Sequence, residues 1–96
     1  MKQSLAKILA VDDDPTWLEQ VPFILDGIAD VTCCESIDQS LMAIDNQYFD
    51  IVLLDLNFKD ELRTGIDIFR RISSMDQEID VIVVSGETRP DKLVQI

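Results

Sequence analysis

The chain has 96 residues, of which 47% are hydrophobic, so it can form one compact core but not two domains of ordinary size. Nineteen acidic residues against eight basic ones give a formal net charge of -11, which leaves little means of binding nucleic acid or an anionic membrane through phosphate contacts. The absence of histidine excludes imidazole bases, and no apolar run approaches the roughly 18 residues that span a bilayer, so we expect a cytoplasmic protein.

The first half of the chain begins with the continuous apolar run Ile8–Val11, which is typical of a strand covered by helices on both faces of a parallel sheet. A helix is predicted to start at Pro15, directly behind Asp14. Pro22 is expected to bend or shorten this helix. Its apolar positions at helical spacing are Leu18, Val21, Leu25 and Ile28. The more polar run Asp30–Cys34 suggests an edge strand, with its two cysteines on opposite faces and reduced.

The second half continues the alternation of helices and strands. Ser36 and Gln39 have the spacing of a capping box, at the start of a helix with Ile37, Leu41 and Ile44 at helical spacing. The apolar runs Ile51–Leu54 and Val81–Val84 predict two more central strands, separated by a helix that contains Ile66, Phe69 and Ile72. A last helix is predicted to start at Thr88. This order predicts an open parallel α/β sheet with right-handed crossovers and helices on both faces.

Polar side chains follow the predicted strands where each strand ends. They are Asp12 to Asp14 after the first strand, Asp55 after the third and Ser85 after the fourth. In open parallel sheets the ligand site lies beyond these carboxyl ends. Two carboxylates about 4 Å apart repel by on the order of 4 kcal/mol at an effective dielectric constant near 20, so we expect a hard cation such as magnesium among them. Beside such an ion, Asp55 could act as a nucleophile toward phosphorus, with the Ser85 hydroxyl as a nearby donor.

These segments, in this order, resemble the receiver domain of bacterial two-component response regulators, which has a flavodoxin-like, CheY-like fold. The resemblance covers nearly the whole chain. Its parts are Lys7–Pro15 for the first strand and acidic pair, Ile51–Leu56 for the phosphoacceptor strand, Gly65–Ile72 for the third helix, and Val81–Gly86 for the strand with the switch hydroxyl.

The resemblance implies a phosphoprotein of signal transduction and phosphorelay. Asp55 would accept a phosphoryl group from a sensor histidine kinase or a phosphotransfer protein and carry it as an aspartyl phosphate. Asp12, Asp13, Asp55 and the backbone carbonyl of Asn57 would bind Mg²⁺, or Mn²⁺ in its place, and Ser85 would be the switch residue. The domain would catalyse only its own phosphorylation and dephosphorylation, and a downstream effector would read the switched surface. No nucleic acid or membrane is an expected partner of this segment.

Two features depart from the family pattern. Phe58 and Lys59 follow the phosphoacceptor strand where the family usually has Met-Pro. The chain ends at Ile96 without a fifth strand and helix, so residues 1–96 are expected to be a receiver domain that is incomplete at its C-terminus. The phosphate-binding lysine of the family ends that fifth strand, and Lys92 is not expected to replace it. An uncovered fourth strand would favour a homodimer.

Two other interpretations stay open on the sequence alone. Asp12–Thr16 also fits the Asp-x-Asp-x-Thr pattern of haloacid-dehalogenase-like phosphatases, with Asp12 as nucleophile, Asp14 as acid/base and Ser85 as the second-motif hydroxyl. That family needs a lysine and further acidic ligands, and it gives no role to Asp55. The third interpretation is a receiver-like interaction module that binds protein partners without being phosphorylated.

Overall fold

The computed structural model describes residues 5–55, 65–75 and 77–84, which form a parallel sheet of strand order β2-β1-β3-β4 and three helices. The strands are β1 (Ala6–Val11), β2 (Ala29–Cys34), β3 (Ile51–Asp55) and β4 (Asp80–Val84). The helices are α1 (Pro15–Ile24), α2 (Ile37–Asn46) and α3 (Gly65–Ser73). The predicted α/β architecture is confirmed, while the helix predicted at Thr88 lies outside the described residues.

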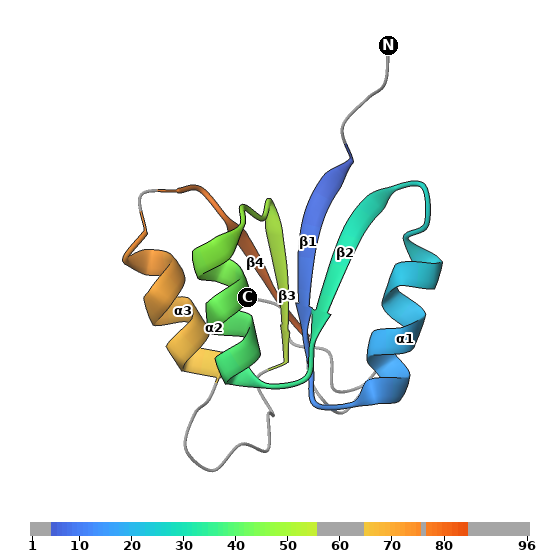
Figure 1. Ribbon diagram of the computed structural model, residues 1–96, viewed down its shortest axis with the longest axis horizontal. Helices are drawn as coiled ribbons and strands as arrows, with labels where there is room; N and C mark the ends of the chain where they lie inside the picture. Colours follow the sequence, from blue (N-terminus) through green and yellow to red (C-terminus); the bar gives the residue numbers. More distant parts are fainter. Residues whose placement is uncertain (1–4, 56–64, 76, 85–96) are drawn as a thin grey trace.

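The sheet is covered by α1 on one face and by α2 and α3 on the other (Figure 1). Alternate residues of β1 supply the two cores, because successive side chains of a strand point to opposite faces. Leu9 and Val11 pack with the α2 and α3 side chains, and Ala10 packs with the α1 side chains. The larger core contains Leu9, Val11, Cys34, Ile37, Ile44, Phe49, Val52, Leu54, Ile68 and Ile72. The smaller one contains Ala10, Leu18 and Val21, with Trp17 packed against it.

Side-chain caps begin the first two helices. The Asp14 side chain accepts a hydrogen bond from the Thr16 N–H at 3.0 Å, and Pro15 takes the first helical position as predicted. Ser36 Oγ accepts from the Gln39 N–H at 3.1 Å. Gln39 Oε1 in turn accepts from the Glu35 N–H at 3.4 Å, one residue earlier than in a standard capping box. None of the described helices is long and apolar enough to cross a membrane.

Replacing Ser36 with Ala is expected to lower the free energy of unfolding by about 1 kcal/mol, because the Gln39 N–H loses its acceptor at the start of α2. Urea unfolding followed by circular dichroism measures this loss. Ser36→Asp keeps an acceptor at the cap and should unfold close to the parent protein. Equal losses in the two variants would show that the cap does not stabilise α2.

Two sequence expectations about burial are wrong. Ile28 is 66% exposed because α1 ends at Ile24, two residues after Pro22, and the chain turns at Gly27, whose φ is 77°. Ile66 is 55% exposed because α3 buries Gly65, Ile68 and Ile72 instead. The run Val81–Val84 forms β4, which is an edge strand among the described strands, in agreement with the expectation of an uncovered fourth strand. Ile82 is 49% exposed because α1 is the only described helix on its face.

Candidate metal centre

The strand register brings Asp12 and Asp55 together. β1 and β3 are parallel neighbours, with Val11 aligned with Leu54, so Asp12 and Asp55 come at the same height at the carboxyl edge of the sheet. Their side chains share a face with Ala10 and Leu53, because side chains two residues apart on a strand point to the same side. Asp13 follows where the chain leaves β1 for α1.

Three carboxylates form a compact cluster at this edge. Asp12, Asp13 and Asp55 each offer one carboxylate oxygen, and these atoms lie within 4.8 Å of one another. Asp12 is 5% exposed and Asp55 is 2% exposed, while Asp13 is partly buried. The cluster therefore combines three acidic groups with little access to the solvent that would screen their repulsion.

Backbone contacts hold Asp12 in place on both sides. Asp12 Oδ1 accepts a hydrogen bond from the Asp14 N–H at 2.9 Å, and the Asp12 N–H donates to the Cys34 carbonyl oxygen at 3.3 Å. The first contact is an Asx turn, and the sequence signal for it is the run of aspartates before a proline. The second ties the cluster to the end of β2, and no local sequence signal predicts it.

Burial raises the pKa of Asp12 from its usual value of 3.8 to about 6. The Asp14 N–H lowers this pKa, but Asp55 raises it through its charge and a side-chain hydrogen bond, and the charge of Asp13 raises it further. The physical cause is that an ionised Asp12 is both poorly solvated and close to like charges. A positive charge within the cluster would remove this penalty.

The donor set fits a hard divalent cation. The cluster offers only carboxylate oxygens, and magnesium prefers one or two carboxylates together with water and phosphate oxygens over a complete protein cage. Asp14 is exposed and its carboxylate caps α1, so the third aspartate of the run has a different role from the first two. The predicted meeting of Asp12, Asp13 and Asp55 is confirmed, while Asn57 and Ser85 lie outside the described residues.

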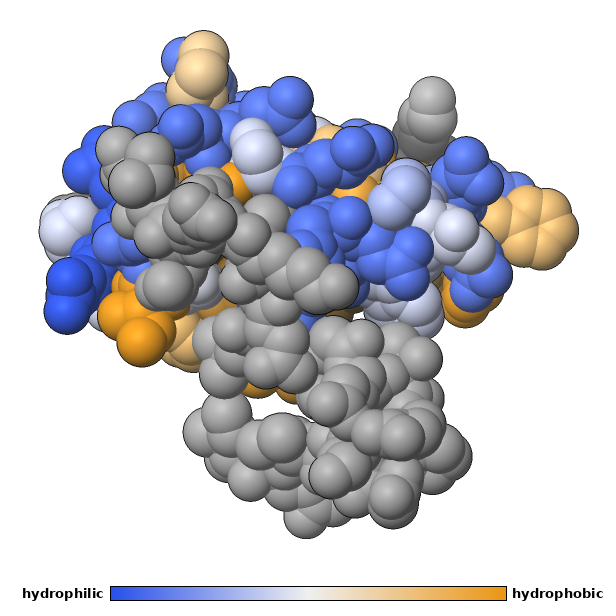
Figure 2. Space-filling model, turned by 90° about the horizontal axis from the view of Figure 1, so that it is seen from below, coloured by the Kyte–Doolittle hydropathy of each residue, from blue (hydrophilic) through white to orange (hydrophobic). Residues whose placement is uncertain are grey.

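Among the described residues that are visible on the side toward which these strand ends point, hydrophilic ones predominate, with smaller apolar areas between them (Figure 2). Fold and cluster together define an α/β protein with a buried acidic cluster at the carboxyl edge of an open parallel sheet. The family model of the response regulator receiver domain matches residues 8–96. The chain belongs to this family, and it is a receiver domain of the kind found in response regulators.

Known proteins agree with the family assignment. The sensory transduction protein LytR of Staphylococcus epidermidis is 29% identical over 86 residues, which cover 86% of this chain and 33% of LytR. The BeF3-activated DrrB receiver domain is 26% identical with a TM-score of 0.72, and the match covers 92% of this chain and 72% of that one. A CheY-like receiver domain from Methanospirillum hungatei is 26% identical with a TM-score of 0.78, covering 92% and 70%. The chain spans about a third of the length of the curated relatives that it matches.

Proposed function

We propose that Asp55 is the phosphoacceptor of this receiver domain and that Asp12, Asp13 and Asp55 hold the divalent cation that phosphorylation requires. The observation that carries this proposal is the convergence of the three carboxylates within 4.8 Å. Mg²⁺ fits the all-oxygen donor set, and Mn²⁺ is the alternative ion. The additional roles predicted for the Asn57 carbonyl and the Ser85 hydroxyl stay predictions.

The chain's own residues perform three tasks in this mechanism. A carboxylate oxygen of Asp55 attacks the phosphorus atom, and the bond from phosphorus to the donor group breaks, so an acyl phosphate forms. The backbone contacts of Asp12 orient its carboxylate before the donor arrives, which lowers the entropic cost of assembling the site. The low exposure of Asp12 and Asp55 keeps bulk water from the reacting oxygen. A bound Mg²⁺ supplies positive charge that stabilises the transferring phosphoryl group.

The phosphatase interpretation is less consistent with these contacts. It makes Asp14 an acid/base next to an Asp12 nucleophile, whereas the Asp14 carboxylate accepts from the Thr16 N–H and lies on the exposed start of α1. It also leaves the nearly fully buried Asp55 without a task beside Asp12. The family assignment and the place of Asp55 in the cluster both favour the phosphoacceptor.

Incubation with acetyl phosphate and Mg²⁺ is expected to add one labile phosphoryl group to Asp55. Mass spectrometry after borohydride trapping locates the modified aspartate. Asp55→Asn should abolish the label while circular dichroism shows that the fold persists, and Asp14→Asn, which keeps an acceptor at the α1 cap, should still be labelled. A label on Asp12 would favour the phosphatase interpretation. A folded parent protein that takes no label would favour the phosphorylation-independent module.

The partners follow from this chemistry. The phosphodonor would be a sensor histidine kinase or a phosphotransfer protein, and the reader of the phosphorylated state would be a downstream effector domain or protein. The charge added at Asp55 would change the balance between two conformations of a nearby surface, as phosphorylation does in other switches. Support for this assignment comes from the family match and from the relatives named as sensory transduction proteins.

A further inference from the structure

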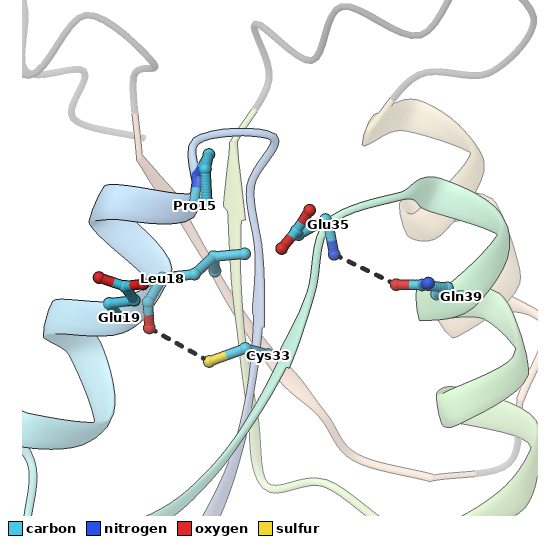
Figure 3. A pocket seen from close by; sticks show the side chains of 6 residues that line it. All are labelled: Pro15, Leu18, Glu19, Cys33, Glu35 and Gln39. Carbon is cyan, nitrogen blue, oxygen red and sulfur yellow. Dashed lines mark hydrogen bonds between the residues drawn. The ribbon is translucent and has the colours of Figure 1, made fainter.

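A pocket of about 360 Å³ lies beside the acidic cluster but contains none of its three aspartates. One wall is the first part of α1, and the other is formed by the end of β2 and the beginning of α2 (Figure 3). The residues that line it are Pro15, Leu18, Glu19, Cys33, Glu35 and Gln39. Because Pro15 follows directly on the run from Asp12 to Asp14, a molecule bound here would sit next to the proposed phosphoacceptor site.

The pocket is negatively charged and has a carboxylate on each side. Glu19 belongs to the α1 wall and Glu35 to the opposite wall, and both are exposed (Figure 3). Of the basic residues that the structure describes, Lys7 lies in β1 and the other two lie in α3, so none of them lines the pocket. The chain as a whole carries a formal net charge of -11. Electrostatics therefore favour a cationic group in this pocket.

Two hydrogen bonds border the pocket, one between its walls and one within the wall formed by β2 and α2. The Cys33 thiol donates to the Leu18 carbonyl oxygen at 3.4 Å, which joins β2 to α1. The Glu35 N–H donates to Gln39 Oε1 at 3.4 Å, which fixes the start of the connection from β2 to α2. Pro15 and Leu18 add an apolar surface to the α1 wall. A ligand with a cationic end and an aliphatic stem matches this combination.

We propose that the pocket binds an arginine side chain of a protein that docks on this receiver domain at its phosphoacceptor edge. A guanidinium group is planar and presents donors in several directions, which suits a pocket with an exposed carboxylate on each wall. The aliphatic part of the side chain would lie along Pro15 and Leu18. That the docking protein is the one that exchanges phosphoryl groups with this domain rests on the proposed function. The selectivity of the pocket for arginine does not depend on the proposed function.

Cys33 allows a direct test, since it lines the pocket and the buried Cys34 is the only other cysteine of the chain. In a Cys34→Ala background, the activated disulfides of N-acetyl-Cys-Arg-amide and N-acetyl-Cys-citrulline-amide compete for Cys33 at equilibrium in a thiol buffer. Citrulline has the size of arginine but no charge. The arginine adduct is expected to exceed the citrulline adduct by about fivefold at low salt, as two exposed ion pairs would give, and by less at high salt.

Matched variants separate the pocket from the overall charge. The double change Glu19→Gln and Glu35→Gln should bring the adduct ratio to about one, whereas Asp26→Asn with Glu78→Gln removes the same charge from exposed sites elsewhere and should leave the ratio unchanged. Equal adducts in the parent, or equal effects of the two double variants on the adduct ratio, would each overturn the proposal. The same ratio in Asp55→Asn shows that the outcome does not depend on phosphorylation.

Discussion

Asp12→Asn is expected to raise the free energy of unfolding by about 1 to 2 kcal/mol at neutral pH in the absence of divalent cations. The pKa of Asp12 rises from 3.8 to about 6 on folding, and each pKa unit corresponds to about 1.4 kcal/mol, but solvent near the partly buried Asp13 screens part of the repulsion and reduces the gain. The asparagine side chain removes the buried charge beside Asp13 and Asp55, and its oxygen can still accept from the Asp14 N–H. Urea unfolding in the presence of a chelator measures the gain.

The pH dependence of this gain has a definite sign. Between about pH 4 and pH 6 the folded protein holds a proton on Asp12 that the unfolded chain has lost, so stability falls as the pH rises through this range. The difference between the variant and the parent should therefore be small below pH 4, grow up to about pH 6, and stay constant above it.

Magnesium provides the second readout. The ion should stabilise the parent protein, because it binds the folded cluster and not the unfolded chain, and should stabilise Asp12→Asn much less. Asp26→Asn, which removes the same charge at an exposed position, should change the stability by no more than about 0.5 kcal/mol. A parent protein that is no less stable than Asp12→Asn at neutral pH would show that the cluster carries no electrostatic strain.

Phe49→Ala is expected to lower the free energy of unfolding by about 3 to 5 kcal/mol, the largest loss predicted for this chain. Phe49 is 1% exposed and lies in the core between the sheet and α2, together with Leu9, Ile44 and Val52. Its removal leaves a cavity that close-packed neighbours cannot fill. Since a domain of this size is stabilised by only about 5 to 15 kcal/mol, such a loss would leave much of the protein unfolded near physiological temperature.

Phe23→Ala is the matched control, because it deletes the same side chain at a position that is 84% exposed. It should change the free energy of unfolding by no more than about 0.5 kcal/mol. Urea unfolding followed by circular dichroism compares the two variants. Similar losses at the two positions would contradict the core that the structure describes.

The sequence predicts the fold well wherever a single pattern of apolar and polar residues dominates a segment. The continuous apolar runs of β1 and β3 and the polar signals before Pro15 and Ile37 give the order of strands and helices, which the structure confirms. Burial within α3 is ambiguous because two stripes fit a helical spacing. One begins at the apolar Ile66, and the other begins at Gly65, which adds no apolar side chain to the pattern. The choice between them depends on packing against the sheet.

The acidic cluster could be predicted because it depends on topology. Once parallel strands are assigned, Asp12 and Asp55 must meet at one edge, whatever the details of the connecting segments. The pocket could not be predicted in this way. It depends on how closely the end of β2 approaches α1, and the contact of the Cys33 thiol with Leu18 that joins them links residues 15 positions apart with no recognisable pattern.

The alignment of Val11 with Leu54 also limits how the chain can change in length. Shifting β3 by a single position would turn the carboxyl group of residue 55 to the opposite side of the sheet, toward the helices α2 and α3. Insertions and deletions are therefore tolerable in the connections before a strand begins, but not between the first paired residue of β1 or β3 and its terminal aspartate. Loop length is free to vary in this protein, whereas strand phase is not.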